Sequence, residues 1–224
     1  MSINMVVDIS HHNGNVDLEK AQQAGIVGVI HKGTQGVRMF DNQYDVNRQK
    51  AAAAGLLWGA YHFGTNADGA AQADYFLSKI SADKHTLLVL DYEPNGIATM
   101  TLTQAKAFVS RVNAVTGRYP GLYSGSLIKQ QLRGKPPDPI LSQCFLWLAQ
   151  YGLQPRGIPA TWSSWTFWQY TDGVAGPPPH AVDGIGPCDR DQFNGTLAEL
   201  QALWGVATNA TATTEASDGP PSGD

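Results

Sequence analysis

Short apolar runs alternate with longer mixed segments along the first 124 residues. Runs rich in Val, Ile, Leu and aromatic residues predict five buried strands, at residues 5–9, 26–31, 56–63, 86–91 and 120–124. The mixed segments predict helices, one beginning at Val16 and others at 41–54, 69–80 and 101–116. Gly55 is placed to terminate the second helix and Thr101 to cap the start of the fourth.

The pattern changes after residue 124. Three more strands are predicted at 144–149, at 164–170 and near Ile185, and a closing helix at 197–204. The segments between these strands are rich in Gly and Pro and show little helical pattern. Repeated strand–helix units imply parallel strands joined by crossovers. We therefore predict an α/β fold: an irregular, flattened TIM-like barrel of about eight strands, the first five in β/α units, smaller than the ~250 residues of a regular barrel.

Composition agrees with one folded domain over residues 1–205, followed by a low-complexity tail at 206–224 that has almost nothing to bury. Of the 224 residues, 42% are hydrophobic and 15% charged, which is enough for a sizeable core. The net charge of −4, without a basic block, argues against nucleic acid and anionic membranes as partners. No apolar stretch is long enough to enter a bilayer, and nothing requires more than a monomer.

The first residues, Met1 to Met5, have neither a basic nor an apolar region, so no secretory signal is expected. The chain is then either released by another route, such as phage lysis or specialised export, or is a mature secreted form. Cys144 and Cys188 form no CxxC pair and no cluster with zinc spacing. We expect two buried free thiols, with one disulfide as the alternative, and neither a metal nor a cofactor.

An acidic tripeptide, Asp91-Tyr92-Glu93, closes the fourth apolar run and is followed by Pro94. Residues two apart on a strand share one face, so Asp91 and Glu93 are predicted to enter the same space. Two carboxyl groups that flank one bond are the usual catalytic residues for hydrolysis of a glycosidic linkage. Taken alone, the tripeptide fits a strand-end turn with a solvated glutamate at least as well.

Other acidic residues are predicted at the same ends of strands. Asp8 ends the first strand, and Asp189 is expected to end the last. Reactive groups of a parallel barrel gather at the C-terminal ends of its strands. Each residue alone could be a helix cap or a turn residue, but Asp8, Asp91, Glu93 and Asp189 would converge at one mouth.

Six segments occur in an informative order, the fifth of them in two parts: VDIS at 7–10, IHKGTQG at 30–36, AAAAGLLWGAYHF at 51–63, LDYE at 90–93, LWLAQY at 146–151 with FWQY at 167–170, and DRDQF at 189–193. In this order they resemble the glycoside hydrolase family 25 lysozymes, also called Chalaropsis-type muramidases. The resemblance extends from Met5 to Trp204. No single segment is specific, but the six in order are. Three positions depart from the family pattern: Gln35 replaces a frequent Glu, Gly33 an Ala and Asp191 an Asn.

The resemblance implies hydrolysis of the β-1,4 bond between N-acetylmuramic acid and N-acetylglucosamine in bacterial peptidoglycan, with retention. Glu93 would be the general acid/base. Asp91 would assist the substrate's N-acetyl group, because side chains two apart on a strand lie roughly 6–7 Å apart at their bases. Direct attack usually involves carboxyl groups about 5–5.5 Å apart, and rotamers could close that gap. Asp8 and Asp189 would position substrate or tune Glu93.

The resemblance also suggests a set of substrate-binding residues: Lys32, Gln35, Tyr61, Tyr123, Trp147, Tyr151 and Gln169. For each aromatic residue in this set, packing in the core is an equal alternative. Tryptophan and tyrosine suit sugar binding because they combine a flat apolar face with a polar rim.

Three other functions compete. A metal-dependent peptidoglycan amidase would use histidines near strand ends, but His11 and His12 are adjacent and point to opposite sides of an extended segment, and no HExxH is present. A family 18 chitinase type would need an acid at the position of Val89. A non-catalytic wall-binding module would need the aromatic residues but not both Asp91 and Glu93.

Overall fold

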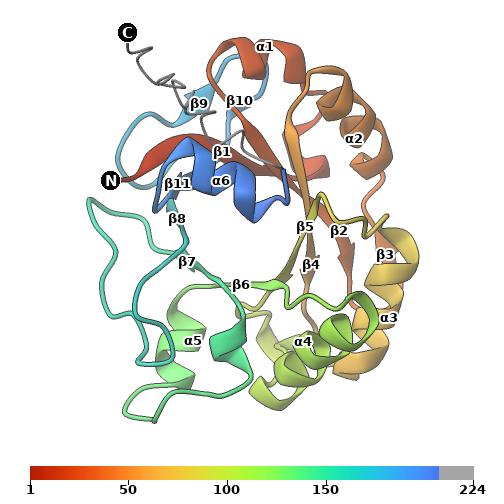
Figure 1. The fold of residues 1–224 in the computed structure, drawn as a ribbon, viewed down its shortest axis with the longest axis vertical. Coiled ribbons are helices and arrows are strands. Elements are labelled where there is room, and N and C mark those ends of the chain that lie inside the picture. The colour runs from red at the N-terminus through yellow and green to blue at the C-terminus, as the bar shows by residue number, and fades with distance from the viewer. Residues whose placement is uncertain (207–224) are drawn as a thin grey trace, which may run out of the picture.

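Eight strands close into a barrel in the computed structural model, which describes residues 1–206 (Figure 1). The barrel strands are β1 (Ile3–Ile9), β2 (Gly28–Gln35), β4 (Leu57–Phe63), β5 (Thr86–Asp91), β6 (Gly121–Ser124), β7 (Leu146–Ala149), β8 (Phe167–Thr171) and β11 (Asp189–Phe193). Closure follows because β1 pairs with both β2 and β11. A short strand, β3 (Met39–Phe40), extends β2 outside the ring. The predicted TIM-like barrel is thus confirmed.

The closing strand differs from the prediction. The segment near Ile185 forms a separate hairpin of β9 (Ala181–Val182) and β10 (Gly186–Pro187). The barrel is completed by β11, which begins at Asp189 and runs antiparallel to both β1 and β8. The expectation that Asp189 ends the last strand was therefore wrong. Because β11 is reversed, however, its first residue still lies at the carboxyl end of β1.

Within residues 1–206, six helices accompany the strands: α1 (Leu18–Gln23), α2 (Tyr44–Ala53), α3 (Gly69–Lys79), α4 (Leu102–Thr116), α5 (Ser126–Gln131) and α6 (Leu197–Leu203). Short 3-10 turns occur at His11–Asn13, Gly96–Ala98 and Leu141–Gln143. Figure 1 shows α1 to α5 around the outside of the barrel, from the top of the view down its right side to the lower left, while the connections after β7 run as long loops on the left. This agrees with the expected loss of helices after the fifth strand, although α5 itself was not predicted.

The helix limits follow from local hydrogen bonds. The Thr101 hydroxyl accepts the backbone N–H of Gln104, whose side chain in turn accepts from the backbone of Thr101, so α4 begins where expected. Gly55 follows α2 with φ of 69°, a conformation that glycine adopts without strain. The predicted start of α2 at Asp41 was wrong. The Asp41 carboxylate accepts the N–H of Gln43, which holds this segment in a turn before the helix.

Alternation along the strands separates two apolar layers. On β5, Leu88 and Leu90 pack in the layer beneath the helices, whereas Leu87 and Val89 pack in the barrel interior. The interior layer also contains residues of other strands and of α6: Val6, Ile30, Trp147, Phe167, Phe193, Leu200 and Trp204. The barrel is therefore filled by side chains, and only the end above this layer is free for a polar site.

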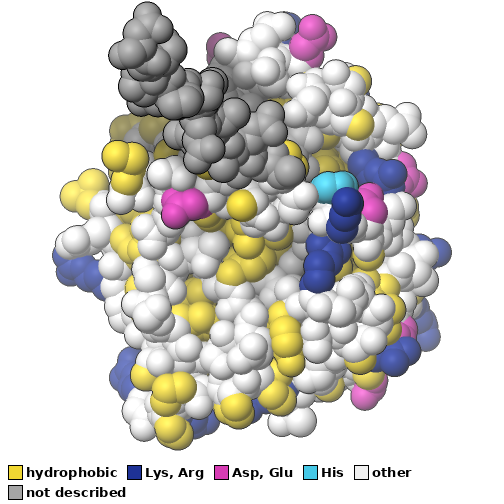
Figure 2. Space-filling view, in the orientation of Figure 1, with side chains coloured by type: hydrophobic (Ala, Val, Ile, Leu, Met, Phe, Trp, Pro, Cys, Tyr) yellow, Lys and Arg dark blue, Asp and Glu magenta, His cyan; other side chains and the backbone are white. Residues whose placement is uncertain are grey.

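Helix α6 closes the amino end of the barrel. The Trp204 indole N–H donates to the backbone oxygen of Trp58 at 2.8 Å, which fixes the end of this helix against the start of β4. In Figure 1 α6 lies across the strands, and Figure 2 shows that the acidic side chains on this face are scattered singly. The carboxyl ends of the strands lie on the opposite side.

Three further expectations concern the whole chain. Within residues 1–206, every helix is too short or too polar to cross a membrane. Cys144 and Cys188 are both buried and free, as predicted. The predicted tail at 206–224 lies, apart from Val206, outside the described residues.

Candidate active site

A polar pocket of about 200 Å³ opens at the carboxyl ends of the barrel strands. Nine of the residues predicted from sequence line it: Asp8, Tyr61, Asp91, Glu93, Tyr123, Trp147, Tyr151, Gln169 and Asp189. Lys32 and Gln35, at the end of β2, are not among the lining residues. They lie beside the pocket, and the Lys32 ammonium donates to Gln35 Oε1 at 2.8 Å. Side chains from distant parts of the sequence therefore converge at one mouth.

The two-residue period of β5 aims its carboxylates into this pocket. Val89 faces the barrel interior, so Asp91 does too, and Glu93 continues this direction just beyond the strand. Tyr92, between them, is buried on the opposite, helix-facing side. The backbone there is fixed because the Tyr92 N–H donates to Tyr123 O at 2.8 Å. The acidic pair thus lies on a rigid support.

Asp8 and Asp189 reach the same mouth from strands of opposite direction. Asp8 lies near the carboxyl end of β1, and Asp189 is the first residue of β11. The two residues are paired across the β1–β11 ladder. Both carboxylates line the pocket, and Asp8 is only 7% exposed.

A relay of hydrogen bonds fixes Asp8 from below. The Tyr123 hydroxyl donates to Gln169 Oε1 at 2.9 Å, and Gln169 Nε2 donates to Asp8 Oδ2 at 2.8 Å. Gln169 is nearly inaccessible to water, so both ends of its amide are satisfied by these two neighbours. Tyr123 and Gln169 therefore hold one Asp8 oxygen in a set position.

Asp191, which has no predicted role from the sequence, lies under the pocket in the structure. It is fully buried, and Trp147 Nε1 donates to its Oδ1 at 2.7 Å. This bond orients the Trp147 ring, which forms part of the pocket floor. The sequence could have indicated this position, because residues two apart on a strand share one face and Asp191 is two residues after Asp189.

Burial and mutual charge control the acidic pair of β5. Burial raises the pKa of Asp91 well above its ordinary value, the negative charge of Glu93 raises it further, and the Lys32 ammonium opposes both. The pKa of Glu93 is also raised by burial, again against the effect of Lys32. Lys32 is itself 8% exposed and lies 4.9 Å from the centre of the Phe63 ring. A carboxyl kept protonated in this way can donate a proton near neutral pH.

The carboxyls of β1 and β11 are shifted in the same direction. Burial, followed by the charges of Asp189 and Asp191, raises the pKa of Asp8 well above its ordinary value. Burial, with a contribution from Asp172, raises the pKa of Asp189 to about 6. Excess negative charge in a poorly hydrated mouth favours the protonated forms of its members.

Three histidines near the strand ends, His11, His31 and His62, are engaged in hydrogen bonds outside the pocket. His31 contacts the backbone oxygen of Lys32 at 2.7 Å and Asn47 at 3.1 Å, and His62 bonds Thr34 in the outer layer. His11, after β1, bonds the fully buried Asp41, a pairing that the sequence did not reveal. Across residues 1–206, His, Cys, Asp and Glu form no group of three arranged to hold a metal ion.

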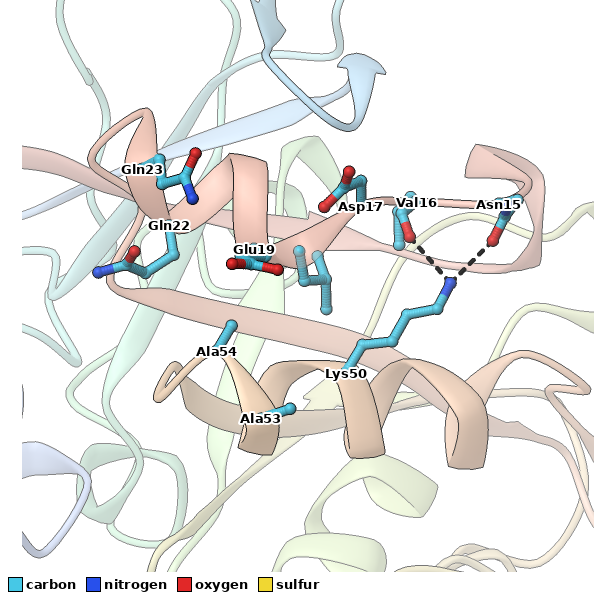
Figure 3. A pocket seen from close by; sticks show the side chains of 10 residues that line it. Asn15, Val16, Asp17, Glu19, Gln22, Gln23, Lys50, Ala53 and Ala54 are labelled. Atoms are coloured by element: carbon cyan, nitrogen blue, oxygen red, sulfur yellow. Dashed lines mark hydrogen bonds between the residues drawn. The ribbon is translucent and has the colours of Figure 1, made fainter.

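A second, larger hollow of about 650 Å³ lies between α1 and α2, away from the carboxylates at the barrel mouth (Figure 3). Lys50 crosses it and donates to Asn15 Oδ1 and to the backbone oxygen of Val16, both at 2.8 Å. Its ammonium therefore holds the segment before α1. Gln22 and Gln23 extend from α1 without a dashed contact to the other residues drawn.

A closed barrel whose mouth gathers carboxylates from several strands defines a barrel enzyme with an acid-rich active site. The sequence model of the Glycosyl hydrolases family 25 matches residues 7–177. The chain therefore belongs to this family and is a glycosidase, as the sequence predicted. The match ends before β11, which contributes Asp189 and Asp191.

Two curated relatives carry names of this activity. Lysozyme M1 of Streptomyces globisporus is 33% identical over 212 residues, covering 88% of this chain and 70% of the relative. An N,O-diacetylmuramidase of Chalaropsis is 33% identical over 186 residues, covering 75% and 88% respectively.

Solved structures share the fold. The bacterial lysozyme of Streptomyces coelicolor superimposes with a TM-score of 0.75 at 32% identity, covering 88% of this chain and 94% of that one. A family GH25 lysozyme of Aspergillus fumigatus gives a TM-score of 0.76 at 29% identity, covering 91% and 99%. The predicted family and the predicted barrel are therefore both confirmed.

Proposed function

We propose that this protein is a muramidase that hydrolyses the β-1,4 bond between N-acetylmuramic acid and N-acetylglucosamine of bacterial peptidoglycan, with retention of configuration. One observation carries the proposal: Asp91 and Glu93 stand side by side in a carboxylate-lined pocket at the mouth of the barrel. Two carboxyl groups at one glycosidic bond are the standard requirement for this reaction. The family and the names of the relatives supply the class of substrate.

Glu93 is the general acid and then the general base. Its partial burial raises its pKa, so the carboxyl is available as a proton donor to the leaving oxygen. After the leaving sugar departs, the resulting carboxylate takes a proton from the attacking water. Lys32 limits the rise in pKa and so keeps this second step possible.

Asp91 assists the substrate's own N-acetyl group. Its Oδ1 atom is buried and has no hydrogen-bond partner among the described residues, so an acceptor is free to take the acetamido N–H. That bond would orient the acetamido oxygen for attack on the anomeric carbon and stabilise the ring that forms, as in substrate-assisted glycosidases. Asp8 and Asp189 complete the negative mouth and hold the sugar on the other side of the pocket.

The remaining lining residues provide the sugar-binding surface. Tyr151 is 44% exposed and available for stacking, whereas Trp147 is 1% exposed and forms the floor. Tyr61 and Tyr123 also line the pocket and have intermediate exposure. We assign Lys32 and Gln35 to the rim at the end of β2. On this proposal the enzyme acts as a monomer with a single cleft, and residues 1–205 are its catalytic domain.

The test is digestion of purified peptidoglycan by the wild type and by Glu93→Gln, with products identified by mass spectrometry after borohydride reduction. We expect reduced muramic acid at the new ends and a loss of rate of at least ~10²-fold in the variant. Glu19→Gln, which removes an exposed carboxylate on α1, is the matched control and should behave as wild type.

Other products would contradict specific parts of the proposal. New peptide ends would indicate an amidase, and wall binding without reducing sugar would indicate a binding module. A trapped covalent sugar on Asp91 would replace substrate assistance by direct attack. NMR of the first anomer released would show the configuration, and inversion would refute the retaining mechanism.

A further inference from the structure

Two carboxyl groups meet beneath the pocket without a donor between them. Asp8 is paired with Asp189 and Val6 with Asp191 across the β1–β11 ladder, so Asp191 is the diagonal neighbour of Asp8 on the same inward face. The two side chains are within hydrogen-bonding reach of each other. Gln169 Nε2 already donates to Asp8 Oδ2, and Trp147 Nε1 already donates to Asp191 Oδ1. Asp191 Oδ2 is buried and has no hydrogen-bond partner among residues 1–206.

This arrangement requires a proton. Two ionised carboxylates at this distance would repel one another, and neither could offer a hydrogen bond. Asp191 is 0% exposed and Asp8 is 7% exposed, so water cannot screen the repulsion. One carboxylic O–H between the two oxygens converts the contact into a hydrogen bond, as in other buried carboxyl pairs that share one proton.

We propose that Asp8 and Asp191 share one proton at neutral pH, and that Asp191 is thereby a positioning residue that holds Asp8 at the floor of the active site. Together with the Gln169 bond, the shared proton holds the Asp8 carboxyl group in place. The positioning role rests on the proposed muramidase function, whereas the shared proton does not.

The charges around the pair favour retention of the proton. Asp189, Arg190 and Cys188 face the pair from β11 and the residue before it, Tyr170 faces it from β8 and Asp91 from β5. Tyr61 of β4, Tyr123 of β6 and Tyr151 after β7 face Asp8 from the pocket. The one cation among them, Arg190, donates from its guanidinium to Asn4 Oδ1 and to the backbone oxygen of Ala181. Burial and the negative charge of Asp189 raise the pKa of Asp191 well above its ordinary value, against the opposing effects of the Trp147 hydrogen bond, the Asp8 contact and Arg190.

The experiment compares the full chain with Asp191→Asn and Asp8→Asn. With Trp147 or Gln169 donating to the amide oxygen, each asparagine directs its N–H toward the remaining carboxylate and removes the need for the shared proton. Asp183→Asn, on an exposed turn, is the matched control. Infrared spectra at about pH 7, far above the pKa of a free aspartic acid, report protonated carboxyls directly.

We expect a carboxylic-acid band in the infrared spectra of the wild type and of Asp183→Asn. The same band should be weaker in Asp191→Asn and in Asp8→Asn. The urea midpoint of the wild type should also fall more steeply with rising pH than that of Asp191→Asn, because only the wild type must give up the shared proton. These measurements require no enzymatic activity, so they remain informative if the muramidase proposal fails. If Asp191→Asn does not fold, Asp8→Asn decides the question.

The positioning role has its own readout. Asp191→Leu, which offers no donor, should lower kcat on cell walls at least tenfold with little change in KM. Asp191→Asn should restore most of this loss, because its amide N–H can donate to Asp8. Unchanged infrared bands in both pair variants would overturn the shared proton. An Asp191→Leu variant as active as wild type would overturn the positioning role.

Discussion

His62 should make the folded state lose stability in acid. Its side chain is fully buried between α3 and α4 and stacks on Phe108 with 4.9 Å between ring centres. Gln72 Oε1 accepts the backbone N–H of Thr65, so this oxygen also accepts from His62 Nε2, 3.2 Å away. His62 Nδ1 then accepts the hydroxyl of Thr34 at 2.7 Å. The folded state therefore favours the neutral form of the His62 imidazole over the protonated form.

The magnitude follows from the shift. Burial lowers the pKa of His62 from 6.5 to about 4. The unfolded chain takes up a proton below pH 6.5, whereas the folded chain resists until pH 4, so stability is full above pH 6.5 and falls between these values. At 1.36 kcal/mol per pKa unit, the loss on going from neutral pH to pH 4 is about 3 kcal/mol. That is a large part of the stability of an ordinary domain.

The assay is urea unfolding of the wild type and of His62→Gln across this range of pH. Carboxylates contribute equally to both proteins, so the difference between the two curves isolates His62. The free energy of unfolding of the wild type should fall by about 3 kcal/mol more than that of the variant. His85→Gln, which changes an exposed histidine before β5, should follow the wild type. Parallel curves for wild type and His62→Gln would refute the reasoning.

Three other predictions follow from single contacts. Lys32→Met removes the ammonium that lowers the pKa of Glu93, so the alkaline limb of the pH–rate profile on peptidoglycan should move to higher pH; an unchanged limb would contradict this. Tyr123→Phe leaves Gln169 Oε1 without its donor and should cost about 1–3 kcal/mol in urea unfolding. Gly69→Ala should cost about 1–3 kcal/mol, because a Cβ there overlaps the backbone oxygen of Gln104, whereas Gly152→Ala, with no neighbour, should have little effect in the same assay.

The apolar pattern by itself determined most of the barrel. Each of the first five apolar runs is followed by polar residues that mark the end of a strand. Within each strand, the period of two residues assigns alternate side chains to the inner and the outer layer. That period was enough to predict that Asp91 and Glu93 share a space. The ordered segments of the family added the glycosidase class. These features are local, so the sequence carries them without knowledge of the packing.

The closing strand and the buried partners were decided only by tertiary structure. The segment at 189–193 is polar and reads poorly as a strand, yet it is required to join β1 to β8, and its reversed direction follows from that position. Asp41 and Asp191 look like ordinary surface acids in the sequence. Their burial, and the contacts with His11 and Asp8, arise from chain segments 30 and 183 residues apart. A local pattern cannot report such contacts, because it contains no distance between remote residues.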